Sequence, residues 1–355
     1  MNPSYNKVHN RFKLNGIYYS YEDLMEVAYS YVKEGEPYQR DIGSFLLDWL
    51  DQHDTITVKT SGSTGTAKLI KVKKQSMVNS AIATGDFFHL KPGDKALHCL
   101  PTTYIAGRMM LVRAIMLGLE IDLIEPASKP VFNTNKAYDF CAMVPMQLKN
   151  AIEDCSNIKT IIVGGAAVSG ALLKQIEKSP CKVYATYGMT ETVTHIALKK
   201  LNNIGRPHDL YFKILPNIEI SQDERACLVI DAPYLANEKV VTNDIVKLYS
   251  KTEFQWLGRF DNMINSGGVK VFPEQIEKKL RSTIDRRFFI ASEPDETLGD
   301  KVVLVLEGDS DPLDNSAFDN LDKYEKPKAV YTVKAFVETG SGKIQRKETL
   351  ELLNN

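Results

Sequence analysis

Hydrophobic positions follow two different patterns along the chain. From about residue 55 to residue 185, short apolar runs alternate with segments in which apolar residues recur every three or four positions. Runs of the first kind predict buried strands, and segments of the second kind predict helices. Alternation at this spacing indicates an α/β domain built around a largely parallel sheet. The strand patterns are 55–59, 96–100, 120–125, 139–144, 160–165 and 182–188, and the helical patterns are 75–88, 107–118, 145–152 and 169–178.

The helical period disappears between residues 201 and 258, where apolar runs follow one another with polar turns between them. This second pattern predicts a β-rich subdomain. A helical pattern with Pro273 in its first turn comes next, and further strand patterns follow it. We therefore expect an N-terminal domain over residues 1–260, with its β-rich subdomain at 201–258, and a small α+β domain over residues 261–355.

Composition and charge exclude several classes of function. Of the 355 residues 43% are hydrophobic and 25% are charged, and 44 basic residues stand against 45 acidic ones. A net charge of −1 gives no global attraction to nucleic acid or to an anionic membrane, so an anion site must be local. The five cysteines have no metal-binding spacing, and no leader or membrane-spanning pattern occurs. We expect a cytoplasmic protein in a reducing compartment, with neither nucleic acid nor membrane as a partner.

The polar stretch TSGSTGTAK directly follows the first strand pattern of the α/β region. Its glycines let the backbone bend so that N–H groups converge, while hydroxyl side chains add donors and the final lysine adds positive charge. Because ligands of α/β folds gather beyond the carboxyl ends of sheet strands, we expect a phosphate cradle here. The last glycine precedes Thr66, which excludes the G-x-x-x-x-G-K-[ST] motif. The candidate phosphate-binding residues are Thr60, Ser61, Gly62, Ser63, Thr64, Gly65 and Lys68.

Four further motifs follow in order: YGMTET at residues 187–192, VTND at 241–244, LGRFDNMINSGGVKVFPEQIE at 257–277 and GSGKIQR at 340–346. With the polar loop, these motifs make the chain resemble the acyl-adenylate-forming superfamily of acyl-CoA synthetases, peptide-synthetase adenylation domains and luciferases. The resemblance covers roughly residues 55–347. It implies the fold of those enzymes, in which a large α/β domain with a β-rich subdomain carries a small mobile C-terminal domain. It also implies ATP, Mg²⁺ and coenzyme A as cofactor, metal and co-substrate.

The resemblance assigns the nucleotide to three segments of the chain. The loop at 60–68 would hold the β- and γ-phosphates of ATP. Tyr187, with Gly188 beside it, would stack on the adenine ring, and Gly165 and Ala166 match the segment that flanks adenine in the family. Taken alone, a tyrosine at a strand end is more often a packing residue, so the assignment depends on the motifs occurring together.

Five polar residues would carry the chemistry in this resemblance. Thr190 would contact the α-phosphate, and Glu191 would bind Mg²⁺, which prefers hard oxygen ligands. Asp244 would accept hydrogen bonds from the ribose hydroxyls, with Arg259 near the same sugar. Lys343 would reach the substrate carboxylate and the α-phosphate, where a preorganised cation is worth roughly 3–4 kcal/mol of transition-state stabilisation.

The family performs two half-reactions at one site by rotating its small domain about a hinge, which the resemblance places at Asp261. Gly267 and Gly268 would then let the backbone approach a thiol-bearing arm closely. The alternative for this glycine pair is an ordinary hairpin turn.

The compact length and the stretches PTTYIAGRMM and YGMTETVTHIALKK look most like the short bacterial form of the 2-succinylbenzoate-CoA ligases of menaquinone biosynthesis. That substrate has a second carboxylate, which Arg108 could receive through a bidentate contact. His195 could line the same pocket. The alternatives are a helix arginine whose charge lies in solvent and a packed core histidine. Tyr104 stands where many relatives have a histidine, which puts any role of that position in doubt.

Three other functions stay open. The chain could be another acyl- or aryl-CoA ligase, since those enzymes share the ATP residues and differ only in the acid pocket. It could load a carrier protein in place of free coenzyme A. It could also be a catalytically inactive relative that acts as a binding module, although Lys343 and Glu191 are both present.

Overall fold

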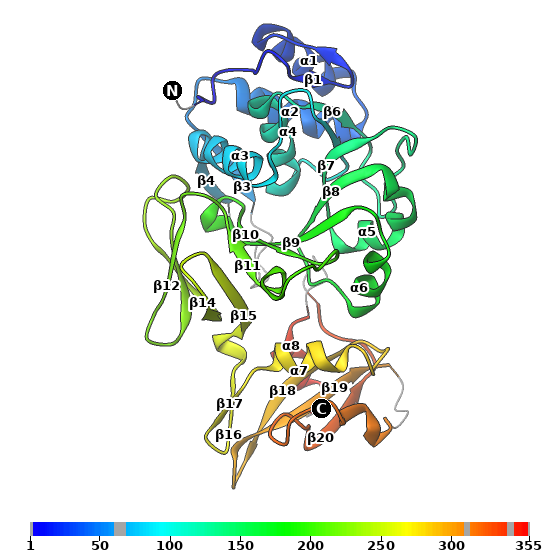
Figure 1. Ribbon diagram of the computed structural model, residues 1–355, viewed down its shortest axis with the longest axis vertical. Coiled ribbons are helices and arrows are strands. Elements are labelled where there is room, and N and C mark those ends of the chain that lie inside the picture. Colours follow the sequence, from blue (N-terminus) through cyan, green and yellow to red (C-terminus); the bar gives the residue numbers. More distant parts are fainter. Residues whose placement is uncertain (1–2, 60–68, 309–312, 339–343, 354–355) are drawn as a thin grey trace.

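The computed structural model describes residues 3–59, 69–308, 313–338 and 344–353. Thirteen of the described strands form one continuous sheet, and its two ends differ in character (Figure 1). The strands are β1 (Lys13–Leu14), β2 (Ile17–Tyr18), β5 (Lys95–His98), β6 (Glu120–Leu123), β7 (Tyr138–Met143), β8 (Ile158–Val163), β9 (Lys182–Gly188), β10 (His195–Lys200), β11 (Phe212–Ile214), β12 (Glu219–Gln222), β13 (Cys227–Asp231), β14 (Val240–Leu248) and β15 (Glu253–Arg259). They lie in the order β12-β13-β14-β15-β11-β10-β9-β8-β7-β5-β6-β1-β2.

The half of the sheet from β9 to β6 is parallel, and helices cover both of its faces. Alternate side chains of a strand point to opposite faces, so Phe140 joins the core beneath one helical layer and Cys141 the core beneath the other. The helices of the first layer are α1 (Tyr21–Glu34), α2 (Pro37–Leu50), α3 (Lys74–Phe88) and α4 (Ile105–Leu117), and those of the second are α5 (Pro145–Ala151) and α6 (Gly170–Glu177). The predicted α/β class is confirmed.

From β10 onward, the sheet is antiparallel, and β11 to β15 follow one another where the sequence has no helical period. The strand predicted at residues 55–59 forms, but it does not belong to the parallel sheet as predicted. β3 (Thr55–Lys59) pairs only with β4 (Leu69–Lys73), in a separate antiparallel ribbon in which Lys59 faces Leu69. The polar stretch at 60–68 therefore joins the two strands of a hairpin and does not follow a strand of the parallel sheet. An apolar run of five residues cannot distinguish these two settings.

A second sheet lies in the C-terminal part of the chain, at the bottom of Figure 1. α7 (Pro273–Leu280) packs on one face of this sheet, and α8 (Arg346–Glu351) contributes Leu350 to the core on the other face. Side-chain contacts connect the two sheets, since Gln275 donates to the carbonyl of Leu257 at 2.6 Å and Arg281 donates to that of Val168 at 3.1 Å. The strands of this sheet are β16 (Ile264–Ser266), β17 (Val269–Val271), β18 (Phe288–Asp295), β19 (Gly299–Glu307) and β20 (Ala329–Val333).

None of the helices in the described ranges combines the length and the apolar character needed to cross a lipid bilayer.

An ion pair fixes the start of α3 against the end of α2. The side chain of Lys74 is fully buried, and its ammonium donates to the carboxylate of Asp51 at 2.6 Å and to the carbonyl of the same residue at 3.0 Å. Burial alone would raise the pKa of Asp51, but hydrogen bonds from Lys74 and His53 outweigh it and lower that pKa to about 2. The buried cation therefore depends on one carboxylate.

We expect Asp51→Asn to lower the free energy of unfolding by about 2 kcal/mol, less than a fully buried pair would lose because the Asp51 side chain is 38% exposed. A depressed pKa stabilises the fold above the ordinary value and loses that effect as pH falls toward the folded value. The difference in free energy of unfolding between the wild type and the variant should therefore be constant from neutral pH to about pH 4 and become smaller below it. Urea unfolding at several pH values measures this difference, and Asp48→Asn, which removes an exposed carboxylate from the last turn of α2, is the matched control. An unchanged free energy for Asp51→Asn would contradict the assignment.

Candidate functional site

Asp244 lies at the centre of a polar cluster formed by three strands of the large sheet. The side chain is only 7% exposed, and its two carboxylate oxygens have different donors. The hydroxyl of Tyr187 in β9 donates to one oxygen at 2.6 Å, and the indole N–H of Trp256 in β15 donates to the other at 3.1 Å. Arg259, opposite Asp244 in the ladder between β14 and β15, brings its guanidinium within 3.6 Å. The pKa of Tyr187 is raised by burial and by Asp244, so the phenol stays protonated at neutral pH.

This cluster requires the sheet to curl. Three strands separate β9 from β14, so in a flat sheet the two would lie roughly 19 Å apart, at about 4.8 Å per strand. The rings of Tyr187, Phe212 and Phe254 fill the inside of the curl, with centroid distances of 5.2–5.6 Å between them. Aromatic packing thus holds one residue of the predicted adenine-binding segment beside the predicted ribose-binding carboxylate.

Gly188 ends β9 close against the backbone at the start of β10. A Cβ at this position would meet the carbonyl oxygen of Thr194 at 2.3 Å and the Cα of His195 at 2.4 Å, so only glycine fits. The position therefore has a packing reason of its own. Its predicted contact with a nucleotide stays a prediction.

A single 3₁₀ turn, η2 (Thr190–Thr192), follows β9. It leaves the Glu191 side chain exposed, without a hydrogen bond or ion pair to a described residue. Val193 ends the turn with φ +66° and ψ −57°, a conformation that a β-branched residue rarely adopts. Such strain costs roughly 1–3 kcal/mol and clusters at functional sites. The strain at Val193 supports a functional role for this turn. The sequence pattern alone does not predict this strain.

A buried polar cluster lies between α3, α4 and β10, inside an otherwise apolar core. His195 is 6% exposed and lies 3.3 Å from the hydroxyl of Thr84 and 3.3 Å from that of Thr194. Arg113 is 2% exposed, and its Nε has no hydrogen-bond partner among the described residues. Burial lowers the pKa of Arg113 to about 10, so the guanidinium is charged at neutral pH. Burial and the Arg113 charge together lower the pKa of His195, which keeps the imidazole neutral.

Arg108, the predicted contact for a substrate carboxylate, has other partners. Its Nε donates to the carbonyl of Thr102 at 3.0 Å, one Nη donates to that of Thr57 at 2.8 Å, and the guanidinium lies over the ring of Phe45. Arg113 lies five positions later on α4. One Nη lies 3.8 Å from the sulfur of Met110, and its Nε has no partner in the described part of the chain. Sequence reasoning missed Arg113 because an apolar pattern surrounds both arginines, and only the packing shows which of them is buried without a carboxylate.

The other predicted site residues fall in three places. Gly165 and Ala166 follow β8 and are exposed, and Gly165 has a positive φ of 83°. Gly267 and Gly268, with φ of 59° and 82°, form the two-residue turn between β16 and β17, where positive φ favours glycine. This is the hairpin alternative, and a contact with a thiol arm stays a prediction. The loop at 60–68 and Lys343 lie outside the described residues.

Asp261 belongs to η4 (Phe260–Asn262), which connects β15 of the large sheet to β16 of the small one. Its carboxylate accepts a hydrogen bond from Asn243 at 3.3 Å and one from Arg259 at 3.4 Å. Both donors belong to the large sheet, so the predicted hinge residue is attached to one side of the connection. Motion about this residue stays a prediction.

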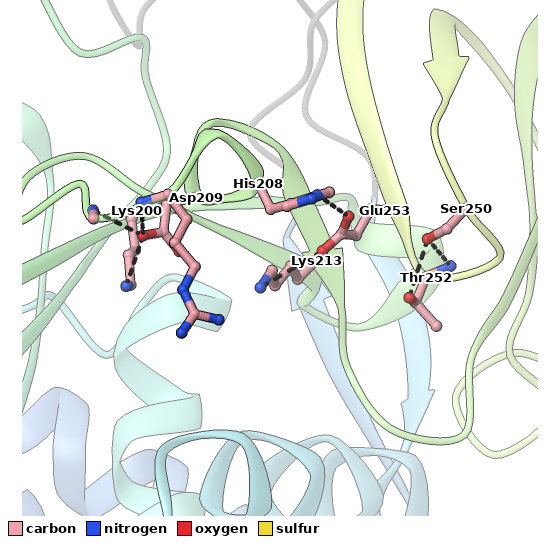
Figure 2. A pocket seen from close by; sticks show the side chains of 9 residues that line it. Lys200, His208, Asp209, Lys213, Ser250, Thr252 and Glu253 are labelled. Atoms are coloured by element: carbon pink, nitrogen blue, oxygen red, sulfur yellow. Dashed lines mark hydrogen bonds and ion pairs between the residues drawn. The ribbon is translucent and has the colours of Figure 1, made fainter.

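A cavity of about 690 Å³ lies beside Lys200, at the opposite end of β10 from His195 (Figure 2). Two of its cationic side chains are already paired: Lys200 contacts Asp209 at 3.1 Å, and Lys213 contacts Glu253 at 3.5 Å. The ring of His208 lies 3.2 Å from the same Glu253 carboxylate. These carboxylates offset most of its positive charge. Although the cavity is large enough for a cofactor, the charge pattern does not favour it as the phosphate site.

Comparison with known proteins shows the family. The AMP-binding enzyme family matches residues 20–226, more than half of the chain. The chain belongs to the AMP-binding enzymes. A crystal structure of an acyl-CoA synthetase (AMP-forming)/AMP-acid ligase II-like protein from Dyadobacter fermentans is 38% identical to this AMP-binding enzyme. The match covers 92% of this chain and 97% of that one, with a TM-score of 0.62.

More distant relatives have a specific substrate in their names. The 2-succinylbenzoate–CoA ligases of Listeria monocytogenes serovar 1/2a and Escherichia coli K12 are 26% and 25% identical to this AMP-binding enzyme, over 94% and 87% of its chain and 75% and 71% of theirs. The O-succinylbenzoate coenzyme A synthetase of Bacillus subtilis, in complex with ATP and magnesium ion, is 19% identical. It superposes with a TM-score of 0.69 over 83% of this chain and 69% of that one. The predicted acyl-adenylate-forming fold is confirmed.

Proposed function

We propose that this AMP-binding enzyme is an ATP-dependent acid–CoA ligase, and that its acid is 2-succinylbenzoate. The reaction would convert 2-succinylbenzoate, ATP and coenzyme A to 2-succinylbenzoyl-CoA, AMP and diphosphate, a step of menaquinone biosynthesis. In the first half, a carboxylate oxygen attacks the α-phosphorus of ATP and the bond to diphosphate breaks. In the second, the thiol sulfur of coenzyme A attacks the acyl carbon, the thiol proton is released and AMP leaves.

The cluster around Asp244 supports the nucleotide part of this proposal. A carboxylate oriented by Tyr187 and Trp256 still has lone pairs free to accept the two ribose hydroxyls. Arg259, whose side chain is 45% exposed, leaves a donor free beside them. In this proposal, Tyr187 packs its ring face on adenine, with Gly165 and Ala166 at the edge of the base.

The exposed carboxylate of Glu191 suits a magnesium ion held together with nucleotide phosphates. Within the part of the chain that the structure describes, no three His, Cys, Asp or Glu side chains gather into a metal site. This agrees with the preference of Mg²⁺ for one or two protein carboxylates plus substrate phosphates. Glu191 would hold the ion, which would neutralise phosphate charge, and Thr190 would position the α-phosphate.

The buried guanidinium of Arg113, which forms no ion pair with a described residue, is the observation that carries the acid assignment. Burying a cation without a counter-ion costs several kcal/mol, so the position suits a ligand that supplies the counter-ion. 2-Succinylbenzoate has two carboxylates, of which only one is activated. We assign the other to Arg113, with neutral His195 as a hydrogen-bond partner beside it. Arg108 would instead tie α4 to the strand that precedes the phosphate loop.

The second half-reaction would use the C-terminal residues. We propose that residues 261–355 move as a domain about Asp261, bringing first Lys343 and then the Gly267–Gly268 turn to the site. The hydrogen bonds from Gln275 and Arg281 that connect the sheets are polar and can be replaced by bonds to water, which favours such a motion.

We expect the purified protein to release AMP with Mg-ATP and coenzyme A when 2-succinylbenzoate is present. The comparison acids are benzoate, a fatty acid, and the two analogues that each lack one carboxylate, 4-oxo-4-phenylbutanoate and 2-butanoylbenzoate. Coupled detection of AMP measures the rate. Turnover of a different acid only would contradict the substrate and keep the ligase chemistry. Turnover that needs a carrier protein in place of coenzyme A would contradict the proposal that coenzyme A is the acceptor. Inactivity with every acid and acceptor would contradict the proposal that the protein is an active ligase.

Replacing Arg113 separates substrate recognition from general damage. In the same assay, Arg113→Met should lower kcat/KM for 2-succinylbenzoate by roughly 100-fold, because hydrogen bonds to charged groups are worth about 1.5–3 kcal/mol each. Whichever single-carboxylate analogue is turned over should be nearly unaffected.

Arg108→Met is the matched control on the same helix. We expect it to change kcat/KM for all acids by the same factor, because Arg108 contacts backbone carbonyls and not the acid. A uniform effect of Arg113→Met on every acid would contradict its assignment to the second carboxylate.

A further inference from the structure

Two of the ordered sequence motifs contain charged residues that have no role in the proposed function, and the structure brings these residues together. Glu274 and Glu277 lie near the end of the motif at 257–277, and Arg346 ends the motif at 340–346. Both glutamates belong to α7, and Arg346 is the first residue of α8. Their contact therefore connects α7 to the residue that follows Lys343 by three positions.

The guanidinium of Arg346 bridges α7 and β18. One Nη donates to the carbonyl of Ile290 at 2.9 Å, and the other lies 2.9 and 3.1 Å from the two carboxylate oxygens of Glu277. Glu277 is 7% exposed and also accepts a hydrogen bond from the amide of Ile290 at 2.9 Å. Burial raises the pKa of Glu277, and the charge of Arg346 is the strongest effect that opposes this rise. Charge-assisted hydrogen bonds of this kind hold the start of α8 in one geometry.

A second carboxylate extends this ion pair toward the large sheet. One oxygen of Glu274 lies 3.9 Å from the guanidinium of Arg346 and accepts a hydrogen bond from the side chain of Asn262 at 2.6 Å. The other oxygen is buried without a hydrogen-bond partner among the described residues. A Cβ on Gly258 of β15 would lie 2.4 Å from this second oxygen, so Glu274 packs directly on the large sheet. The cluster around Arg346 therefore reaches from α8 to β15.

Two pairs of residues close the base of the segment that contains Lys343. Glu338 and Ile344 form an antiparallel bridge, and the amide of Gln345 donates to the carbonyl of Val337 at 2.8 Å. Ile344 also packs against the core beneath α8. The described pairing thus reaches to within one residue of the predicted catalytic lysine.

We propose that Arg346 is a positioning residue for the first half-reaction. It fastens the base of the segment that contains Lys343 to α7, and α7 contacts the large sheet through Glu274 and Gln275. This inference rests on the proposed function, in which Lys343 takes part in adenylate formation. The second half-reaction, in which the C-terminal residues move away from this arrangement, does not need the link.

Arg346→Met in the full-length protein tests the link by comparing the two half-reactions. Exchange of labelled pyrophosphate into ATP, with Mg²⁺ and the acid that the wild type activates, should slow by roughly 100-fold, as for the loss of an ion pair with several charged hydrogen bonds. The KM for ATP should stay within about twofold, because Arg346 does not bind the nucleotide. Thioester formation from coenzyme A and the separately synthesised acyl adenylate should stay within about threefold.

Lys347→Met is the matched control, because it removes an exposed cation at the next position of α8. We expect it to leave both half-reactions unchanged. Arg346→Lys keeps the charge but not the planar fork that reaches a carbonyl and a carboxylate together, so it should recover only part of the lost exchange. Equal loss of both half-reactions in Arg346→Met, or unchanged pyrophosphate exchange, would overturn the positioning role.

Hydrogen–deuterium exchange separates this inference from the ligase proposal, since it needs no turnover. The amide of Gln345 should exchange at least about 10-fold faster in Arg346→Met than in the wild type, and at the wild-type rate in Lys347→Met. Unchanged protection would overturn the link even in a protein that activates no acid. Faster exchange in a protein that activates no acid would support the link and contradict the ligase proposal. Glu277→Gln, which keeps an acceptor for the amide of Ile290, provides the same comparisons where Arg346→Met fails to fold.

Discussion

The buried carboxylate of Asp244 imposes the constraint on which the proposed nucleotide site depends. A carboxylate at 7% exposure is tolerated only where donors replace water, and these donors come from β9 and β15. Because β9 and β14 are not neighbours in the sheet, satisfying Asp244 requires the curl that Phe212 and Phe254 fill. The same curl brings the YGMTET and VTND motifs together. One desolvated carboxylate thus couples the α/β half of the sheet to its β-rich half.

The strand and helix periods predict most of the large sheet, because each parallel strand is a short apolar run between helices. They could not place β3, since its apolar run fits a hairpin as well as a parallel sheet. The ordered motifs predicted Tyr187 and Asp244 as partners in one site, and the structure brings these two side chains into contact. Trp256 was not predicted, because an isolated tryptophan in a strand pattern has no signal that distinguishes a donor to Asp244 from a core residue.

The two arginines of α4 show where sequence reasoning ends. Arg108 and Arg113 share one apolar helix, and the charge alone does not say which of them meets a carboxylate. Packing decides, because Arg108 reaches two backbone carbonyls while Arg113 is enclosed with its Nε unpaired. A cation kept in a core without a counter-ion has a cost that stability alone does not explain. The proposed recognition of a substrate carboxylate would offset this cost, and the Arg113 charge, with burial, keeps His195 beside it neutral.

We propose that this protein activates a dicarboxylic acid as its adenylate. Exchange of labelled pyrophosphate into ATP, measured with Mg²⁺ and 2-succinylbenzoate but without coenzyme A, isolates the first half-reaction. We expect exchange when the acid is present and none when it is left out. Absence of exchange under conditions in which the protein binds ATP would contradict it.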